Sequence, residues 1–237
     1  MRLENVVPWG RSKAEYVGMF DLTPQDPFRR ILDCAGGPAS FNAEMSRQGH
    51  EVLSCDPIYR FSAEDIARRV EETYREIMSG VRANLKGFVW RKIESPERLG
   101  EIRMSAMRRF LEDFPRGFRE GRYVAEELPV LPFGTDRFDL ALCSHFLFTY
   151  SEQLSENFHL VSILEMCRVA EEVRIFPLLT SSVHRGGSIG EPYPHLKPVV
   201  NELEKQGYEA QVKRVPYEFQ KGGNEMLRVR RLTTRGA

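Results

Sequence analysis

The chain has 237 residues, enough for one α/β domain with a full hydrophobic core. Lysine plus arginine and aspartate plus glutamate both total 34, so no net charge attracts the chain to nucleic acid or to a membrane surface. The sequence contains no run apolar enough to cross a membrane, no signal-peptide core and no C-x-x-C pair among its four cysteines. We therefore expect a cytoplasmic protein with reduced thiols, no metal site and no membrane partner.

The first predicted element is a short helix within an N-terminal helical arm, residues 1–27. Ser12 and Glu15 have the spacing of a capping box, so the helix is expected to begin after Ser12. Tyr16 and Phe20 lie on one face of that helix. We expect this aromatic face to pack against the rest of the chain.

The next segment predicts a strand, a tight turn, a helix and a second strand. The apolar runs 30–34 and 52–55 have the length of strands. Between them, Gly36 and Gly37 allow a tight turn. Pro38 suits the first turn of a helix, because the N–H that proline lacks is not used there. The helix is expected to end at a glycine about ten residues later.

Asp56 closes the second strand and is the most informative carboxylate in the chain. It follows Gly37 by 19 positions, close to the roughly 20-residue offset at which a carboxylate meets a ribose in nucleotide-binding βαβ units. A dinucleotide fold has G-x-G-x-x-G, whose free backbone N–H groups surround the pyrophosphate. Here those positions hold Ala35, Gly37 and Ser40, and Pro38 removes one donor. We therefore expect an adenosine-containing cofactor without a pyrophosphate.

Residues 61–119 interrupt the alternation of strands and helices. Ser62 is a suitable N-cap for a first helix, and Ser95, which a proline follows, for a second. Basic doublets at 68–69 and 108–109 are interleaved with acidic residues, as on a solvated helical face. We interpret the region as a helical insertion that forms a lid or a substrate-selecting region.

Strands and helices alternate again after residue 120. The strands of this part are predicted at 122–125, 138–143, 172–177, 209–215 and 225–231, and the helices at 160–169 and 197–206. Strands separated by helices imply a parallel sheet, whereas two final strands joined by a short glycine-containing connection imply an antiparallel pair. We therefore predict an α/β, Rossmann-like, mostly parallel sheet with helices on both faces and an antiparallel last strand.

Three segments resemble the class I S-adenosylmethionine-dependent methyltransferases, namely ILDCAGGPASF, LSCDP and VAEELPVLPFGTDRFDLALCSHFLF. The resemblance covers about residues 28–60 and 120–231. It is strongest to a subgroup with an LPF-x-x-x-x-FDL segment, here Leu131–Phe133 and Phe138–Leu140. It implies that residues 1–237 form a single methyltransferase-like domain with a seven-stranded sheet and S-adenosyl-L-methionine as cofactor.

The resemblance also implies a role for positions around the turn. Asp33 would end the first strand and organise the turn, and Asp56 would accept hydrogen bonds from both ribose hydroxyls. Glu127, with Glu126 as second choice, would meet the adenine amino group. Alanine stands at two of the three glycine places of the family turn, which narrows the approach to the cofactor. The implied cofactor contacts are Asp33, Ala35, Gly36, Gly37, Asp56, Pro57, Glu126, Glu127, Cys143 and Ser144.

The N-terminal arm resembles the helical lead-in that many of these enzymes fold over the cofactor. On that resemblance Arg11 would pair with the cofactor carboxylate through a charge-assisted bond, and Tyr16 would cover it. The alternative is an amphipathic helix whose aromatic side chains are buried only for packing.

His145 follows the fourth strand, where α/β sheets bind their ligands, and is the candidate general base. Methyl transfer is an in-line displacement, so a base is needed only when the acceptor must lose a proton. The alternative is a histidine that packs on the loop. Candidate substrate contacts, each weighed against an ordinary surface role, are His184, Arg185, Tyr193, His195 and Tyr217.

We predict a methyltransferase that uses S-adenosylmethionine and acts on a small or medium-sized acceptor by in-line displacement. Three alternatives stay open: a catalytically silent protein that binds the cofactor, an RNA methyltransferase that holds phosphates with its basic doublets, and an NAD-dependent oxidoreductase. The balanced charge disfavours the RNA enzyme. Pro38 and the missing third glycine disfavour the oxidoreductase.

Overall fold

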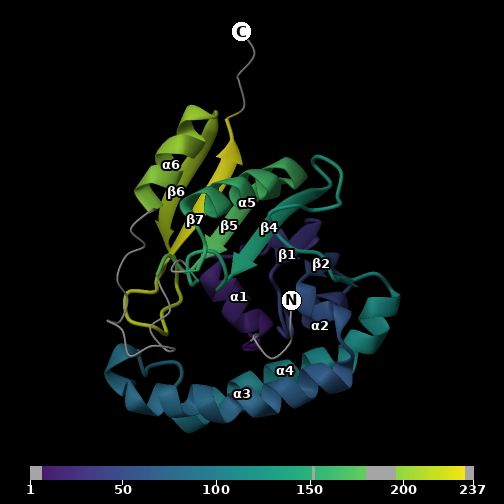
Figure 1. Ribbon diagram of the computed structural model, residues 1–237, viewed down its shortest axis with the longest axis vertical. Helices are drawn as coiled ribbons and strands as arrows, with labels where there is room; N and C mark the ends of the chain where they lie inside the picture. Colours follow the sequence, from purple (N-terminus) through teal and green to yellow (C-terminus); the bar gives the residue numbers. More distant parts are fainter. Residues whose placement is uncertain (1–6, 151–152, 180–195, 233–237) are drawn as a thin grey trace.

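The computed structural model describes residues 7–150, 153–179 and 196–232. A seven-stranded sheet with the strand order β3-β2-β1-β4-β5-β7-β6 forms its centre (Figure 1). Strands β1 to β5 pair in parallel, and β7 runs antiparallel to both β5 and β6. This arrangement confirms the predicted fold class. The strands are β1 Ile31–Cys34, β2 Val52–Cys55, β3 Tyr123–Val124, β4 Phe138–Ser144, β5 Ala170–Phe176, β6 Tyr208–Arg214 and β7 Glu225–Arg231.

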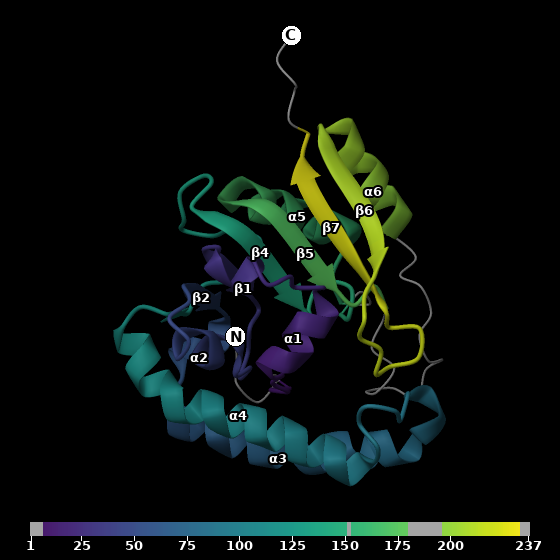
Figure 2. The ribbon, with the colours of Figure 1, turned by 180° about the vertical axis from the view of Figure 1, so that it is seen from behind.

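Helices cover both faces of the parallel part of the sheet, which is why its central strands are almost continuously apolar. Helices α5 (Glu156–Val169) and α6 (Leu196–Lys205) pack on one face, in the core that contains Leu32 and Val173. Helices α1 (Lys13–Met19) and α2 (Phe41–Ser46) pack on the other, against side chains such as Leu140 (Figure 2).

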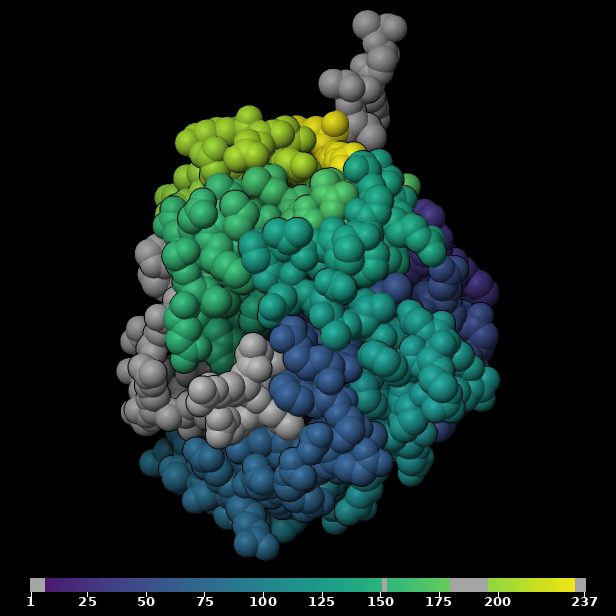
Figure 3. Space-filling view, turned by 45° about the vertical axis from the view of Figure 1, so that its right-hand side comes forward, coloured from purple at the N-terminus to yellow at the C-terminus, as the bar shows by residue number. Residues whose placement is uncertain are grey.

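Two long helices, α3 (Ala63–Ala83) and α4 (Pro96–Arg119), make up most of the 61–119 segment. They lie side by side across the edge to which the parallel strands point (Figure 1). In the space-filling view their blue and teal surface forms the lower part of the molecule (Figure 3). Single-turn 3-10 helices stand at η2 (Asp26–Phe28), η3 (Pro57–Arg60) and η4 (Leu85–Gly87). None of the helices within the described ranges is both long and apolar enough to span a bilayer.

The predicted caps agree with the structure, and one helix start does not. The capping box of Ser12 and the N-caps Ser62 and Ser95 are all present. Helix α2, however, begins at Phe41 and not at Pro38. The intervening residues form a turn because the amide of Ser40 donates to the carbonyl of Arg11, in the N-terminal arm, at 3.0 Å.

The remaining differences from the predicted elements are small. Strand β3 is limited to two residues, and β5 begins two residues before its predicted start. Helix α5 begins four residues before its predicted start because Ser155, whose side chain accepts from the Phe158 amide, caps it.

Candidate functional site

A cavity of about 600 Å³ lies along the carboxyl edge of the sheet, and residues of the N-terminal arm and the 61–119 segment contribute to its walls. Parallel α/β sheets bind their ligands at this edge, and the volume is that of an ordinary small-molecule site. The predicted site residues in its lining are Arg11, Tyr16, Ala35, Gly36, Gly37, Asp56, Pro57, Glu126, Glu127, Ser144, His145 and Tyr217.

Asp56 is held in one orientation at the end of β2. Its Oδ1 accepts from the amide of Ile58 at 2.8 Å, and its Oδ2 accepts from the amide of Gly37 at 2.9 Å. Burial raises the pKa of this carboxyl to about 6, and the two backbone bonds limit the rise. A carboxylate has about four acceptor positions, so both oxygens keep capacity for a ligand.

Four backbone amides of the glycine turn form hydrogen bonds within the protein. Pro38 has no N–H, and the amide of Gly37 bonds Asp56. The other engaged amides are Gly36 to the Cys55 carbonyl at 3.4 Å, Ala39 to the Gly36 carbonyl at 3.3 Å and Ser40 to the Arg11 carbonyl at 3.0 Å. A pyrophosphate needs several free N–H groups at such a turn, and these amides supply none.

Asp33 lies beneath the cavity and supports its floor. Its oxygens accept from the hydroxyls of Tyr16 and Ser54, both at 3.0 Å, and burial raises its pKa to about 7. A Cβ at Gly36 would lie 2.4 Å from Asp33 Oδ2, so only glycine fits there. Asp33 thus shapes the turn by close approach and fixes the Tyr16 ring, which also stacks on Phe41 at 4.3 Å.

Glu126 and Glu127 both line the cavity beyond the end of β3, and both are exposed. Glu127 forms an ion pair with Arg60 at 3.9 Å. This end of the cavity therefore offers two solvent-accessible carboxylates beside Asp56.

The side chain of Cys143 is not placed at the cavity, in contrast to the expected cofactor contact. It is fully buried in the core beneath α5 and α6, and burial raises the pKa of its thiol to about 12. Side chains alternate between the faces of a strand, so Cys143 points into the core. Ser144 and His145, which follow it, are the residues that reach the cavity.

His145 has a left-handed backbone conformation, with φ of +51°, which is uncommon for a residue with a side chain. Its amide donates to the carbonyl of Phe176 at 2.7 Å, which holds the conformation. Its Nδ1 lies 2.9 Å from the hydroxyl of Ser144. Burial and then the charges of Arg11 and Arg103 lower its pKa well below the usual value, so the imidazole is neutral at neutral pH.

A buried polar cluster that the sequence did not reveal joins three parts of the chain. Arg103, from α4, is 1% exposed and donates to both carboxylate oxygens of Glu15, in α1. Tyr217, between β6 and β7, donates to the same carboxylate at 3.0 Å. Burial opposes ionisation of Glu15, but Arg103 outweighs it and lowers the pKa to about 2. The spacing of Ser12 and Glu15 predicts the capping role that Glu15 also has. Its ion-pair partner Arg103 is 88 residues away along the chain.

Arg11 lines the cavity without a carboxylate partner among the described residues. Its Nη1 donates to the carbonyl of Trp9 at 3.0 Å, and its Nε is buried without a hydrogen-bond partner. Burial and then the charge of Arg103 lower its pKa to about 10, so it stays a cation. Because Glu15 balances only one of the two arginines, this wall carries an excess positive charge.

Four of the predicted substrate residues, His184, Arg185, Tyr193 and His195, lie outside the described residues. The fifth, Tyr217, lines the cavity. In the described part of the chain, no group of three or more His, Cys, Asp or Glu side chains is arranged to hold a metal ion.

Several solved structures have a similar arrangement at low sequence identity. A magnesium protoporphyrin IX methyltransferase from Synechocystis with bound S-adenosylmethionine is 11% identical, with a TM-score of 0.42, over 86% of this chain and 71% of the other. A SAM-dependent methyltransferase from Methanosarcina mazei is 16% identical, with a TM-score of 0.44, over 89% and 98%. One from Aquifex aeolicus is 14% identical, with a TM-score of 0.38, over 84% and 79%. The fold assignment above rests on the strand order itself.

The sequence comparison gives a closer relationship. No model of a known protein family matches the chain. The uncharacterized protein MJ0045 of Methanocaldococcus jannaschii is 32% identical over 232 residues, which is 98% of this chain and 99% of that protein. The chain belongs to the same protein family as MJ0045.

Proposed function

We propose that this protein is a methyltransferase that uses S-adenosyl-L-methionine and acts on a small or medium-sized acceptor. The observation that carries the proposal is the pairing of Asp56 with the glycine turn. The carboxylate is fixed toward the cavity by the amides of Gly37 and Ile58. The amides of Gly36, Ala39 and Ser40 in the adjoining turn form hydrogen bonds within the protein. The pair suits a ribose and is a poor cradle for a pyrophosphate, so it supports a nucleoside cofactor without phosphate.

The other residues around the cavity fit the parts of this cofactor. Asp56 would accept from the ribose hydroxyls, and Glu127 or Glu126 from the adenine amino group. The uncompensated charge of Arg11 suits the carboxylate of the methionine part, and its buried Nε–H lacks a partner in the protein. Tyr16, anchored on Asp33, would cover that part.

The chemistry asks little of the protein beyond alignment and exclusion of water. When bound, the cofactor supplies an electrophilic methyl group. The neutral imidazole of His145 lines the centre of the cavity, between the turn after β1 and the end of β5. It would accept the proton of an acceptor that must lose one.

Calorimetric titration with S-adenosylhomocysteine tests the proposal. Asp56→Asn keeps one backbone contact and removes one charged acceptor. We expect the binding free energy of S-adenosylhomocysteine to fall by about 2 kcal/mol or more, which raises the Kd roughly 30-fold. Hydrogen bonds to charged groups contribute about 1.5–3 kcal/mol each. Asp21→Asn, at an exposed aspartate, is the matched control and should bind as the wild type does.

If the wild type and Asp56→Asn bound S-adenosylhomocysteine with equal affinity, the proposed contact between Asp56 and the ribose would be contradicted. Tight binding of NAD would show that the turn accepts a diphosphate after all. Release of S-adenosylhomocysteine from S-adenosylmethionine with any acceptor would separate an enzyme from a silent binding protein.

A further inference from the structure

The cavity extends beyond the turn and Asp56, past the end of β5, to the connection between β6 and β7. In the sheet, β2 and β3 lie on one side of β1, whereas β5 and β7 lie on its other side. The cavity therefore has two distinct halves, one beside Asp56 and one beside the end of β5. The second half is walled mainly by apolar and aromatic side chains. They are Trp9, Ile77, Phe88, Phe176, Tyr217 and Phe219.

One aromatic wall is fixed by backbone hydrogen bonds between segments far apart in the sequence. The amide of Val89 donates to the carbonyl of Phe219 at 2.7 Å, and the amide of Lys221 donates to the carbonyl of Gly87 at 2.9 Å. The rings of Phe88 and Phe219 stack with their centroids 4.9 Å apart. Figure 2 shows the β6–β7 connection, in yellow, reaching the 61–119 segment at this point.

The other wall leads back to the candidate base. Tyr217 is anchored by its hydroxyl on Glu15, and its ring meets Phe176 edge-on at 5.7 Å. Phe176 in turn meets the imidazole of His145 edge-on at 5.5 Å. A ligand between the two walls would therefore have an edge near His145.

Among the described residues, one ion pair lies in the wall of this half. Arg103 and Glu15 form an ion pair, and the hydroxyl of Tyr217 donates its hydrogen bond to the same carboxylate of Glu15. Arg11, a cation without a carboxylate partner among the described residues, lies where the two halves meet. Its carbonyl accepts from Ser40 of the turn, and its charge acts on Tyr217 and His145. Rigid aromatic walls favour a flat ring system, because aromatic rings interact through specific stacked and edge-on geometries.

We propose that this second half is the acceptor subsite and that it takes a flat aromatic compound. The inference rests on the proposed function for the identity of the site as an acceptor subsite. The binding of the ring itself depends only on the walls. The walls are preorganised by the backbone bonds and by the buried polar cluster, so the ligand does not have to order them.

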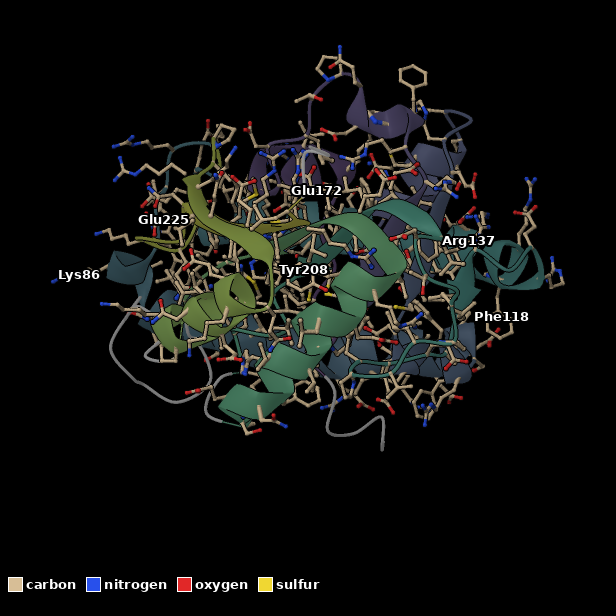
Figure 4. All side chains as sticks on the ribbon, turned by 90° about the horizontal axis from the view of Figure 1, so that it is seen from above. Lys86, Phe118, Arg137, Glu172, Tyr208 and Glu225 are labelled. Atoms are coloured by element: carbon tan, nitrogen blue, oxygen red, sulfur yellow. The ribbon has the colours of Figure 1, made fainter. Side chains whose placement is uncertain are left out.

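The test compares two probes of nearly equal size by calorimetry, 2-naphthol and its saturated analogue decahydro-2-naphthol, with and without S-adenosylhomocysteine. We expect 2-naphthol to bind at least tenfold more tightly. Phe88→Leu/Phe219→Leu replaces both rings of one wall by aliphatic side chains and should reduce the preference to about twofold. Phe118→Leu, whose ring is exposed and points away from the fold (Figure 4), is the control and should keep it.

Equal binding of the two probes, absence of binding, or an unchanged preference in the double variant would overturn the inference. The affinity of the double variant for S-adenosylhomocysteine, which should match the wild type, shows that the cavity is still folded. A protein that binds 2-naphthol with the expected preference but does not bind S-adenosylhomocysteine would retain the aromatic subsite and contradict the proposed function. The two failures are thus distinguishable.

Discussion

At the scale of single residues, Asp33 is a carboxyl group that the fold buries with two hydroxyl partners. It is 1% exposed, and no cation lies within ion-pair distance among the described residues. Burial raises its pKa to about 7, although the hydroxyls of Ser54 and Tyr16 partly stabilise the charge. A carboxyl with a pKa near 7 changes its charge in the physiological range, so Asp33 links the stability of the cavity floor to pH.

We predict that Asp33 makes the protein less stable as the pH rises from 4 to 8. An unfolded aspartate loses its proton near pH 4, whereas folded Asp33 keeps it to about pH 7. The stabilising contribution of protonated Asp33 to the free energy of unfolding is therefore fully present below pH 4 and is lost as the pH rises through 7. The size is at most about 4 kcal/mol. Asp33→Asn cannot titrate and should show a flatter dependence.

Urea denaturation of wild type and Asp33→Asn at several pH values measures this difference. Asp56, with a pKa raised to about 6, acts in the same direction in both proteins and cancels in the comparison. Asp21→Asn, at the surface, should follow the wild type. Parallel curves for wild type and Asp33→Asn would show that Asp33 ionises in the folded protein as it does in the unfolded chain.

At the scale of secondary-structure elements, local signals were predictable and contacts between elements were not. Ser12, Ser62 and Ser95 cap their helices as expected, because a cap depends on residues three positions apart. The predicted start of α2 was wrong because the amide of Ser40 donates to the carbonyl of Arg11 in the N-terminal arm. A contact of that kind leaves no periodic pattern in the sequence.

The ion pair between α1 and α4 leads to a second prediction. Arg103→Met leaves the carboxylate of Glu15 buried without its cation, and we expect the free energy of unfolding to fall by about 3–5 kcal/mol. The double variant Glu15→Gln/Arg103→Met removes both charges and should regain most of that loss. Urea denaturation of the single and double variants measures the effect.

Arg98→Met is the control, because Arg98 pairs with Glu101 on the exposed side of the same helix. The fall in the free energy of unfolding of Arg98→Met should be a small fraction of the fall in Arg103→Met. If the two single variants were equally stable, the buried pair would contribute no more than a surface pair, and the link between the arm and α4 would rest on apolar packing alone.

At the scale of the whole molecule, the two halves of the cavity differ in how far the sequence could predict them. The turn and Asp56 belong to one continuous strand-turn-helix-strand unit, so their spacing along the chain reports their geometry. The aromatic half is assembled from the arm, the 61–119 segment, the end of β5 and the β6–β7 connection. These segments meet only through the tertiary fold, and no motif in any one of them indicates the others.

The same contacts decide whether the 61–119 segment is a separate lid or part of the core. It is tied to the core at three places: Asp113 pairs with Arg122 at 2.7 Å, Arg103 with Glu15, and the chain around Val89 with the β6–β7 connection. These contacts lie at the tip, the middle and the base of the pair formed by α3 and α4. Contacts along its whole length favour a single cooperative unfolding transition. Of the two predicted roles, a substrate-selecting region fits this arrangement better than a lid.

Trp90 provides the measurement, because it packs on Phe219 at 5.4 Å at the tip of the segment and the chain has only one other tryptophan. In a Trp9→Phe variant, the urea midpoint from Trp90 fluorescence should coincide with that from far-UV circular dichroism, which reports the whole fold. A fluorescence transition at lower urea would mean that the segment detaches before the core unfolds.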